Sequence, residues 1–148
     1  MKRMILILVI GLFSLTAKAS GGEKYSLPLV YNMADYSYTE YIYAICKDLK
    51  IEGNIYLVKT TLPIHGYVEK QKFGWVIYVS RNDSYYGITI AHEMVHIWQC
   101  ENGRLDMSKP DYSIKKQQYI NSGYATLEQE ARDYGRKLYY QNKHFINY

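Results

Sequence analysis

The sequence has little cysteine, little proline and no repetitive segment. Only two cysteines and three prolines occur in 148 residues, and neither a repeat nor a low-complexity tract is present. Nothing in the chain resembles a linker between two units, so its length suits a single domain. The cysteines, Cys46 and Cys100, leave two interpretations open. In an oxidising compartment they could form a disulfide between two helices, or both could be small buried side chains.

An apolar run long enough to cross a bilayer is also missing. After the basic start Met1-Lys2-Arg3, the apolar residues 4–15 number about a dozen, whereas a membrane-spanning helix needs roughly 20. Small residues follow at Ala17 and Ala19, as before a signal-peptidase site. The pattern predicts a signal peptide at 1–19 and an exported mature chain at 20–148, either periplasmic or secreted. No cysteine directly follows the apolar run, so we expect no lipid anchor. Because the run is too short to span a bilayer, we also expect no stable membrane insertion after cleavage.

Without the predicted signal peptide, the chain has almost no excess of positive over negative charge. The whole chain has a formal net charge of +4, and residues 1–19 contain three basic residues and no acidic one. The mature chain therefore has 15 basic and 14 acidic residues, a net charge of +1. No basic cluster remains that could follow a phosphate backbone, which argues against a nucleic-acid partner. The sequence does not indicate an oligomeric state.

Helical and strand periodicities follow one another in an order typical of an α+β fold with one core. A capping box formed by Ser37 and Glu40 predicts the start of the first helix. The last two strands are expected to form a hairpin through 71–74, within a small antiparallel sheet. The expected elements are a helix from 37 to 53, strands at 54–60, 65–70 and 75–81, a helix at 85–101, a loop or broken helix at 104–122, and a C-terminal helix at 125–142.

The segment TIAHEMVHIWQCENG, residues 89–103, contains three ionisable side chains in an apolar helix. His92 and His96 are four residues apart, so a helix places both imidazoles on one face, as two zinc ligands from one helix require. Glu93 is close enough to take a proton from a metal-bound water without being a ligand. Burying such groups is costly unless they are paired or bind a metal. The apolar neighbours that would bury this helix are Ile88, Ala91, Val95, Ile97 and Trp98.

A catalytic zinc site needs a third protein ligand, and two carboxylates of the C-terminal helix are candidates. Helical phase places Glu128 on an apolar stripe with Ala131, Gly135 and Leu138, where small residues allow another helix to approach closely. Glu130 shares a face with charged residues and is the second candidate. We therefore expect His92, His96 and Glu128 to bind one Zn²⁺ ion, with Glu130 as the alternative ligand.

The motif HEMVH, followed downstream by EQEARD, resembles the gluzincin metallopeptidases, and in particular their small single-domain members. The resemblance covers roughly residues 75–138. It implies a zincin-like fold, zinc ligands His92, His96 and Glu128, and Glu93 as general base. It also implies hydrolysis of a peptide or protein substrate, bound along an edge strand that would be 75–81 here. The sequence departs from the family pattern after Ala131, where Arg132 stands before Asp133. A role for Asp133 in supporting a metal ligand is therefore left open.

Two other interpretations remain open. The chain could be an exported binding or structural module that keeps the fold without catalytic turnover, with its eighteen tyrosines forming a binding surface. Alternatively, the two histidines could be hydrogen-bonded core residues. A residue that stabilises the transition state is not identified by the sequence, where Tyr119, Tyr124 and Tyr134 are candidates. Gln99 could orient a ligand or cap a neighbouring strand.

Overall fold

The computed structural model describes residues 27–106 and 124–148. The predicted signal peptide at 1–19 and most of the predicted loop at 104–122 lie outside these residues. Within them, no helix is both long enough and apolar enough to cross a membrane.

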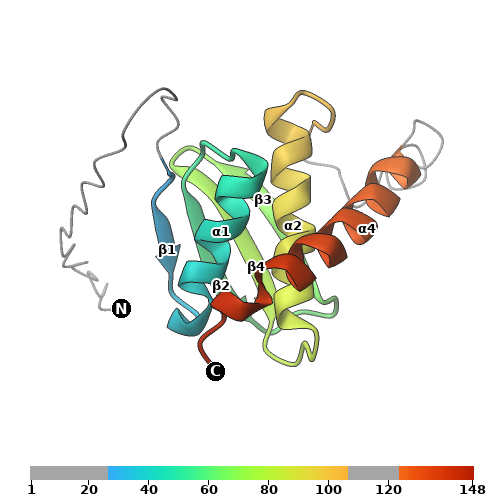
Figure 1. The fold of residues 1–148 in the computed structure, drawn as a ribbon. Helices are drawn as coiled ribbons and strands as arrows, with labels where there is room; N and C mark the ends of the chain where they lie inside the picture. Colours follow the sequence, from blue (N-terminus) through green and yellow to red (C-terminus); the bar gives the residue numbers. More distant parts are fainter. Residues whose placement is uncertain (1–26, 107–123) are drawn as a thin grey trace, which may run out of the picture.

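The described residues fold into an α+β arrangement of three α-helices and a four-stranded sheet (Figure 1). The predicted motif helix and C-terminal helix are confirmed to within one residue at each end. The strand β1 was not expected from the sequence. The elements are β1 (Val30–Asn32), the 3-10 helix η1 (Tyr36–Tyr38), α1 (Thr39–Leu49), β2 (Ile55–Thr60), β3 (Gly66–Gln71), β4 (Gly74–Ser80), α2 (Tyr86–Glu101), α4 (Tyr124–Asn142) and the 3-10 helix η2 (Lys143–Phe145).

The sheet is mixed, so the prediction of an antiparallel sheet is wrong. Its strand order is β1-β2-β4-β3, with β1 parallel to β2, β2 parallel to β4, and β3 antiparallel to β4. Helix α1 connects β1 to β2, and such a crossover returns the chain to the same end of the sheet. The expected hairpin between β3 and β4 is present, with Gln71 paired to Gly74.

The strand order also corrects the expected edge strand. Residues 75–81 correspond to β4, which lies between β2 and β3 and is therefore an interior strand. The edges of the sheet are β1 and β3. The burial pattern agrees, since six of the seven residues of β4 are buried and only one of the six in β3 is.

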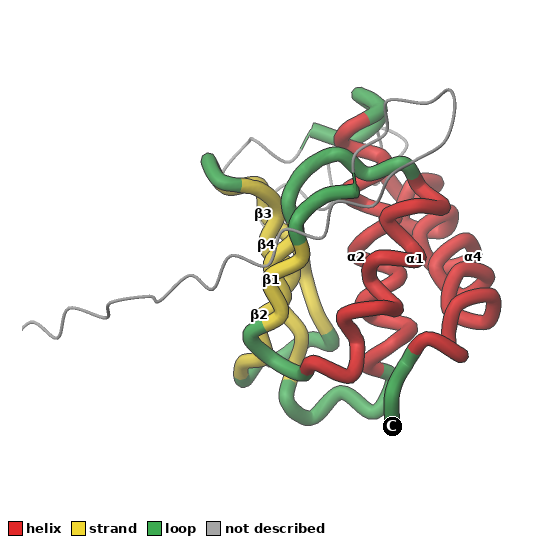
Figure 2. Tube along the Cα trace, turned by 60° about the vertical axis from the view of Figure 1, so that its left-hand side comes forward, coloured by secondary structure: helices red, strands yellow, loops and turns green. Residues whose placement is uncertain are grey.

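The helices of the described ranges lie on one face of the sheet, and α4 packs against α2 on the side away from the strands (Figure 2). The main core forms between the sheet and helices α1 and α2. Alternation along β2 and β4 turns every second residue toward these helices. The fully buried large side chains of this core include Tyr41, Ile42, Ile45, Ile55, Leu57, Ile77, Ile90, Met94 and Ile97.

The start of α1 differs from the expected capping box. Asp35, not Ser37, provides the side-chain cap: its carboxylate accepts a hydrogen bond from the Ser37 N–H and caps η1, which precedes α1. The chain reaches this position because the Asn32 side-chain oxygen accepts hydrogen bonds from the N–H groups of Ala34 and Asp35. The helix ends at Leu49, before Gly53, because Lys50 adopts a left-handed conformation with φ of 53°.

The C-terminal end of α2 is fixed by the carboxylate of Glu101. Its oxygens accept hydrogen bonds from the N–H groups of Glu52 and Gly53, at 3.1 and 3.0 Å, in the turn before β2. They also accept one from Trp75 Nε1, at 2.9 Å, at the start of β4. One side chain therefore links the motif helix to two strands.

The described residues include both cysteines, and the structure does not join them by a disulfide. Cys46 is fully buried on α1 and Cys100 is half-buried on α2. The structure therefore corresponds to the second of the two interpretations, in which both are small buried or partly buried side chains.

Candidate metal centre

Helix α2 brings the two motif histidines together on one face. The Nε2 atoms of His92 and His96 are 3.1 Å apart, and their rings meet edge to face with centroids 4.7 Å apart. The side chain of His96 is only 3% exposed, whereas that of His92 is 19% exposed. The i, i+4 spacing thus produces the paired imidazoles that the sequence predicts.

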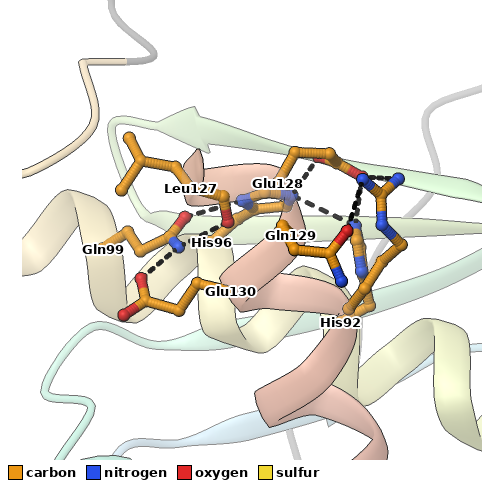
Figure 3. Close-up of polar contacts among 8 residues, drawn as sticks. His92, His96, Gln99, Leu127, Glu128, Gln129 and Glu130 are labelled. Atoms are coloured by element: carbon orange, nitrogen blue, oxygen red, sulfur yellow. Dashed lines mark hydrogen bonds and ion pairs between the residues drawn. The ribbon is translucent and has the colours of Figure 1, made fainter. Parts of the chain in front are cut away.

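Glu128 reaches both histidines from the first turns of α4 (Figure 3). Its Oε1 lies 3.3 Å from His92 Nε2, and its Oε2 lies 3.1 Å from His96 Nε2. Glu130 points elsewhere and is not part of this group. Of the two candidate carboxylates, Glu128 is the one that the structure places beside both histidines.

These three residues can hold a metal ion. One ligand atom from each of His92, His96 and Glu128 lies within 4.8 Å of the other two. A tetrahedral zinc ion bound at about 2.0–2.1 Å by each ligand would place the ligand atoms about 3.3 Å apart. The two imidazole Nε2 atoms are 3.1 Å apart, and each lies 3.1 or 3.3 Å from a different oxygen of the Glu128 carboxylate, close to this spacing. The donor set and its arrangement are therefore compatible with a bound metal ion.

Small residues on α4 allow the two helices to approach closely. A Cβ atom at Gly135 would lie 2.9 Å from the Cα and 3.0 Å from the N of His92. Ala131, one turn earlier, is fully buried. This confirms the inference that the stripe of Glu128, Ala131 and Gly135 faces a neighbouring helix.

Gln99 holds His96 from the side opposite the cluster (Figure 3). The Oε1 of Gln99 lies 2.9 Å from His96 Nδ1. Its Nε2 donates to the Leu127 carbonyl at 2.9 Å and to Glu130 Oε2 at 2.8 Å. Two roles were considered for Gln99, and its contact with His96 corresponds to the first, in which it orients a candidate ligand. Glu130 belongs to this network.

The electrostatics of the cluster reflect the close approach of Glu128 to two histidines. Burial alone would raise the pKa of Glu128, but hydrogen bonds to His92 and His96 lower it well below its usual range. Burial likewise opposes the charged form of His96, but the hydrogen bond to Glu128 and the charge of Glu93 raise its pKa above the usual value. The site therefore attracts positive charge, whether protons or a metal ion.

Glu93 lies on α2 and is 6% exposed. Burial raises its pKa, and the charges of His96 and His92 oppose this effect in part. In the described part of the chain, Glu93 is not one of the three residues whose ligand atoms converge. This placement, close to the histidines but outside the ligand set, is what the sequence predicts for a general base.

The other described residues considered in the sequence make their contacts outside the cluster. His65 precedes β3 and places its Nδ1 2.9 Å from the carboxylate of Asp83, and His144 is exposed in η2. Asp133 accepts a hydrogen bond from Gln129 on the surface of α4. Tyr134 packs edge-on against Trp98. Tyr119 and the side chain of Tyr124 lie outside the described residues.

One charged neighbour of the cluster was missed by the sequence reasoning. The Nη1 of Arg132 lies 3.6 Å from Glu128 Oε1, and its side chain is half exposed. The i, i+4 spacing from Glu128 is the signal that could have identified it.

Two cavities, of about 170 and 190 Å³, lie away from the cluster, at the first turn of α2 and beside His65. The linings of these cavities contain none of His92, His96 and Glu128.

The chain was compared with protein-family models, with curated proteins and with solved structures, and none of the three comparisons found a match.

Proposed function

We propose that this protein is an exported zinc-dependent peptidase, of the zincin type, that hydrolyses peptide bonds in a peptide or protein substrate. The observation that carries the proposal is the convergence of His92 Nε2, His96 Nε2 and the Glu128 carboxylate at separations of 3.1 to 3.3 Å. The export signal expected at 1–19 supports a location outside the cytoplasm, in the periplasm or the medium.

The donor set favours zinc over calcium and magnesium. Two imidazoles and one carboxylate form the His₂Glu set of catalytic zinc sites, which leave a fourth position open for water. Calcium and magnesium prefer oxygen ligands only. A zinc ion bound here would lower the pKa of the water that it holds and polarise the substrate carbonyl.

The chain itself supplies the proton transfers. Glu93 follows His92 directly and is buried in a setting that raises its pKa, as suits a group that must both accept and release a proton. Glu93 takes a proton from the attacking water and then donates it to the leaving amine nitrogen. His92, His96 and Glu128 would hold the metal throughout.

The edge strand beside α2 offers a place for the substrate backbone. β3 is an edge of the sheet and packs against α2, where a Cβ at Gly66 would lie 2.7 Å from the Thr89 side chain. An extended peptide can pair with the unpaired groups of an edge strand. This support comes from β3 and not from 75–81, the strand that the sequence suggested.

A second candidate, a binding module without turnover, is favoured by tyrosines on the face of the sheet that the helices leave uncovered (Figure 2). Tyr56 and Tyr78 alternate with core residues and so point away from the helices. Each stacks on a tyrosine of a neighbouring strand. The pairs are Tyr31–Tyr56, with centroids 4.5 Å apart, and Tyr67–Tyr78, at 4.6 Å.

Metal content and proteolysis, measured together, separate these candidates. Wild type, Glu93→Gln and the control Glu40→Gln, which changes an exposed carboxylate on α1, would be purified without chelator and incubated with an unfolded protein substrate. We expect about one zinc per chain in all three, with cleavage by wild type and Glu40→Gln only. Chelator should abolish that cleavage.

Each contrary outcome points to a different alternative. Zinc bound at full occupancy without cleavage by any form would support the binding module. If wild type binds no zinc, the histidines are hydrogen-bonded core residues and the peptidase proposal is wrong.

A further inference from the structure

Gln99 contacts a candidate ligand on α2 and the helix that supplies another. It lies three residues after His96 and is fully buried. Its oxygen meets His96 Nδ1, and its nitrogen meets the Leu127 carbonyl and the Glu130 carboxylate. Leu127 and Glu130 flank Glu128, so one amide connects the two helices at the metal centre.

The hydrogen bonds of Gln99 permit only one orientation of its amide. The Leu127 carbonyl and the ionised Glu130 carboxylate only accept hydrogen bonds, so the amide nitrogen must face them. The amide oxygen therefore faces His96, and it can only accept. His96 must then carry a proton on Nδ1 and turn Nε2 toward His92 and Glu128, which is the tautomer that a metal ligand needs.

The far end of this network is also fixed. Arg104 Nη1 lies 2.9 Å from Glu130 Oε2 and donates to Oε1 at 3.0 Å. The backbone N–H of Arg104 donates to the Gln99 carbonyl at 2.8 Å, and its guanidinium lies over the Trp98 ring. The turn after α2 thus folds back so that Arg104 holds Glu130, which in turn holds the Gln99 amide.

We propose that Gln99 is a positioning residue of the metal centre, and that Glu130 and Arg104 hold it in place. Through this network the protein sets the tautomer of His96 and the position of Glu128 on α4 before any metal binds. Glu130, the alternative ligand considered from the sequence, serves in this network and does not bind the metal. The inference rests on the proposed function only in requiring that the site binds zinc.

The test compares Gln99→Met with wild type and with Gln141→Met, an exposed position on α4 away from the cluster. Zinc affinity would be measured by competition with a chromophoric chelator, and metal-free stability by urea unfolding. Loss of a partner that orients a metal ligand typically lowers metal affinity about 10–100-fold. We expect a loss in this range for Gln99→Met and none for Gln141→Met.

The absorption spectrum of the Co²⁺ form at saturating metal separates positioning from a loss of stability alone. A merely less stable protein that still binds cobalt would keep the wild-type spectrum, whereas a displaced His96 changes the ligand field. We expect an altered spectrum for Gln99→Met. Wild-type zinc affinity together with an unchanged cobalt spectrum would overturn the inference while leaving the metal centre intact. Failure of wild type to bind zinc would overturn the metal centre itself and the inference with it.

Variants at Glu130 keep the test decisive if Gln99→Met does not fold. Glu130 is partly exposed, and Glu130→Gln removes the charge and one of the two acceptor oxygens that meet Gln99 and Arg104, while keeping the size of the side chain. We expect it to weaken zinc binding less than Gln99→Met does. Gln99→Glu would place a second carboxylate against Glu130, and adding Glu130→Gln removes that repulsion. Tighter zinc binding by the double variant than by Gln99→Glu alone is the expected rescue, and equal affinities would contradict the network.

Discussion

The backbone of His92 lies directly against Gly135. A Cβ atom at Gly135 would approach the His92 Cα to 2.9 Å and the His92 N to 3.0 Å. Both atoms belong to the backbone of α2, so neither can move aside as the end of a flexible side chain would. The close approach of α2 and α4 depends on the absence of a side chain at Gly135. The distance from Glu128 to the histidines depends on that approach.

Gly135→Ala is therefore expected to destabilise the protein and to weaken zinc binding. At an unhindered helical site this change stabilises by about 1 kcal/mol. Here the added methyl group meets a close-packed backbone, for which overpacking typically costs about 1–3 kcal/mol. Urea unfolding and chelator competition would measure both effects, with the exposed Lys137→Ala on the same helix as control. A Gly135→Ala protein with higher stability and unchanged zinc affinity would contradict this account of the helix contact.

Removal of a ligand should have a larger effect than removal of the residue that positions it. We expect Glu128→Ala and His96→Ala to lower zinc affinity by more than the about 10–100-fold typical of partners that only orient a ligand. Asp133→Ala and His144→Ala, which change exposed residues outside the cluster, should bind zinc as wild type does. Chelator competition on the four variants would measure this. Wild-type affinity in Glu128→Ala would show that another group is the third ligand.

The metal-free protein should show a specific pH dependence. The pKa of His96 is raised above its ordinary value of 6.5, so its contribution to stability is complete below pH 6.5 and is lost as the pH rises through the folded pKa. The pKa of Glu128 is lowered from 4.5, so its contribution is complete above pH 4.5 and is lost as the pH falls through the folded pKa. Both contributions are therefore present between pH 4.5 and 6.5.

Urea unfolding in the presence of chelator, from pH 3 to pH 9, would measure this dependence. Glu128→Gln should flatten it, because the carboxylate that shifts the His96 pKa is removed. Identical profiles for wild type and Glu128→Gln would show that the two groups are not coupled in solution. Zinc affinity should instead fall as the pH decreases, because protons compete with the metal for the imidazoles.

Cys46 should resist modification in the folded protein. Burial raises the pKa of its thiol to about 12, with a smaller effect from the charge of Glu101, so little reactive thiolate forms near neutral pH. Titration with a thiol reagent should detect the half-buried Cys100 in the native protein and Cys46 only after denaturation. If the denatured, unreduced protein shows no reactive thiol, a disulfide joins the two cysteines and this prediction is wrong.

The candidate ligand set was accessible to sequence reasoning because it depends on short-range spacing. His92 and His96 are separated by one helical turn, and the phase of α4 distinguishes Glu128 from Glu130. The Gln99 network was not accessible, since it depends on how the amide meets Leu127 and Glu130 across a helix interface. Only three-dimensional packing brings these groups within hydrogen-bonding distance of one another.

The sheet shows the limit of pattern reasoning more clearly. Alternation along 54–60 and 75–81 identifies strands but does not reveal which strands are neighbours, or in which direction they run. β1 has only three residues, too few for a periodic signal, and its pairing with β2 makes that side of the sheet parallel. The start of α1 was misjudged because Asp35 and Ser37 both fit the role of a cap, and only the turn at Asn32 decides between them.

The hydrogen bonds of Glu101 tie the end of α2 to the beginnings of two strands. The histidines on α2 are therefore held more firmly to the sheet than Glu128 on α4. The imidazoles belong to a helix held at its end by the sheet, whereas the carboxylate belongs to α4, which lies one layer further out. We expect heating to loosen the outer helix first. The centre would then pass through a stage in which paired imidazoles alone retain the ion, so metal release would precede global unfolding and would follow the departure of α4.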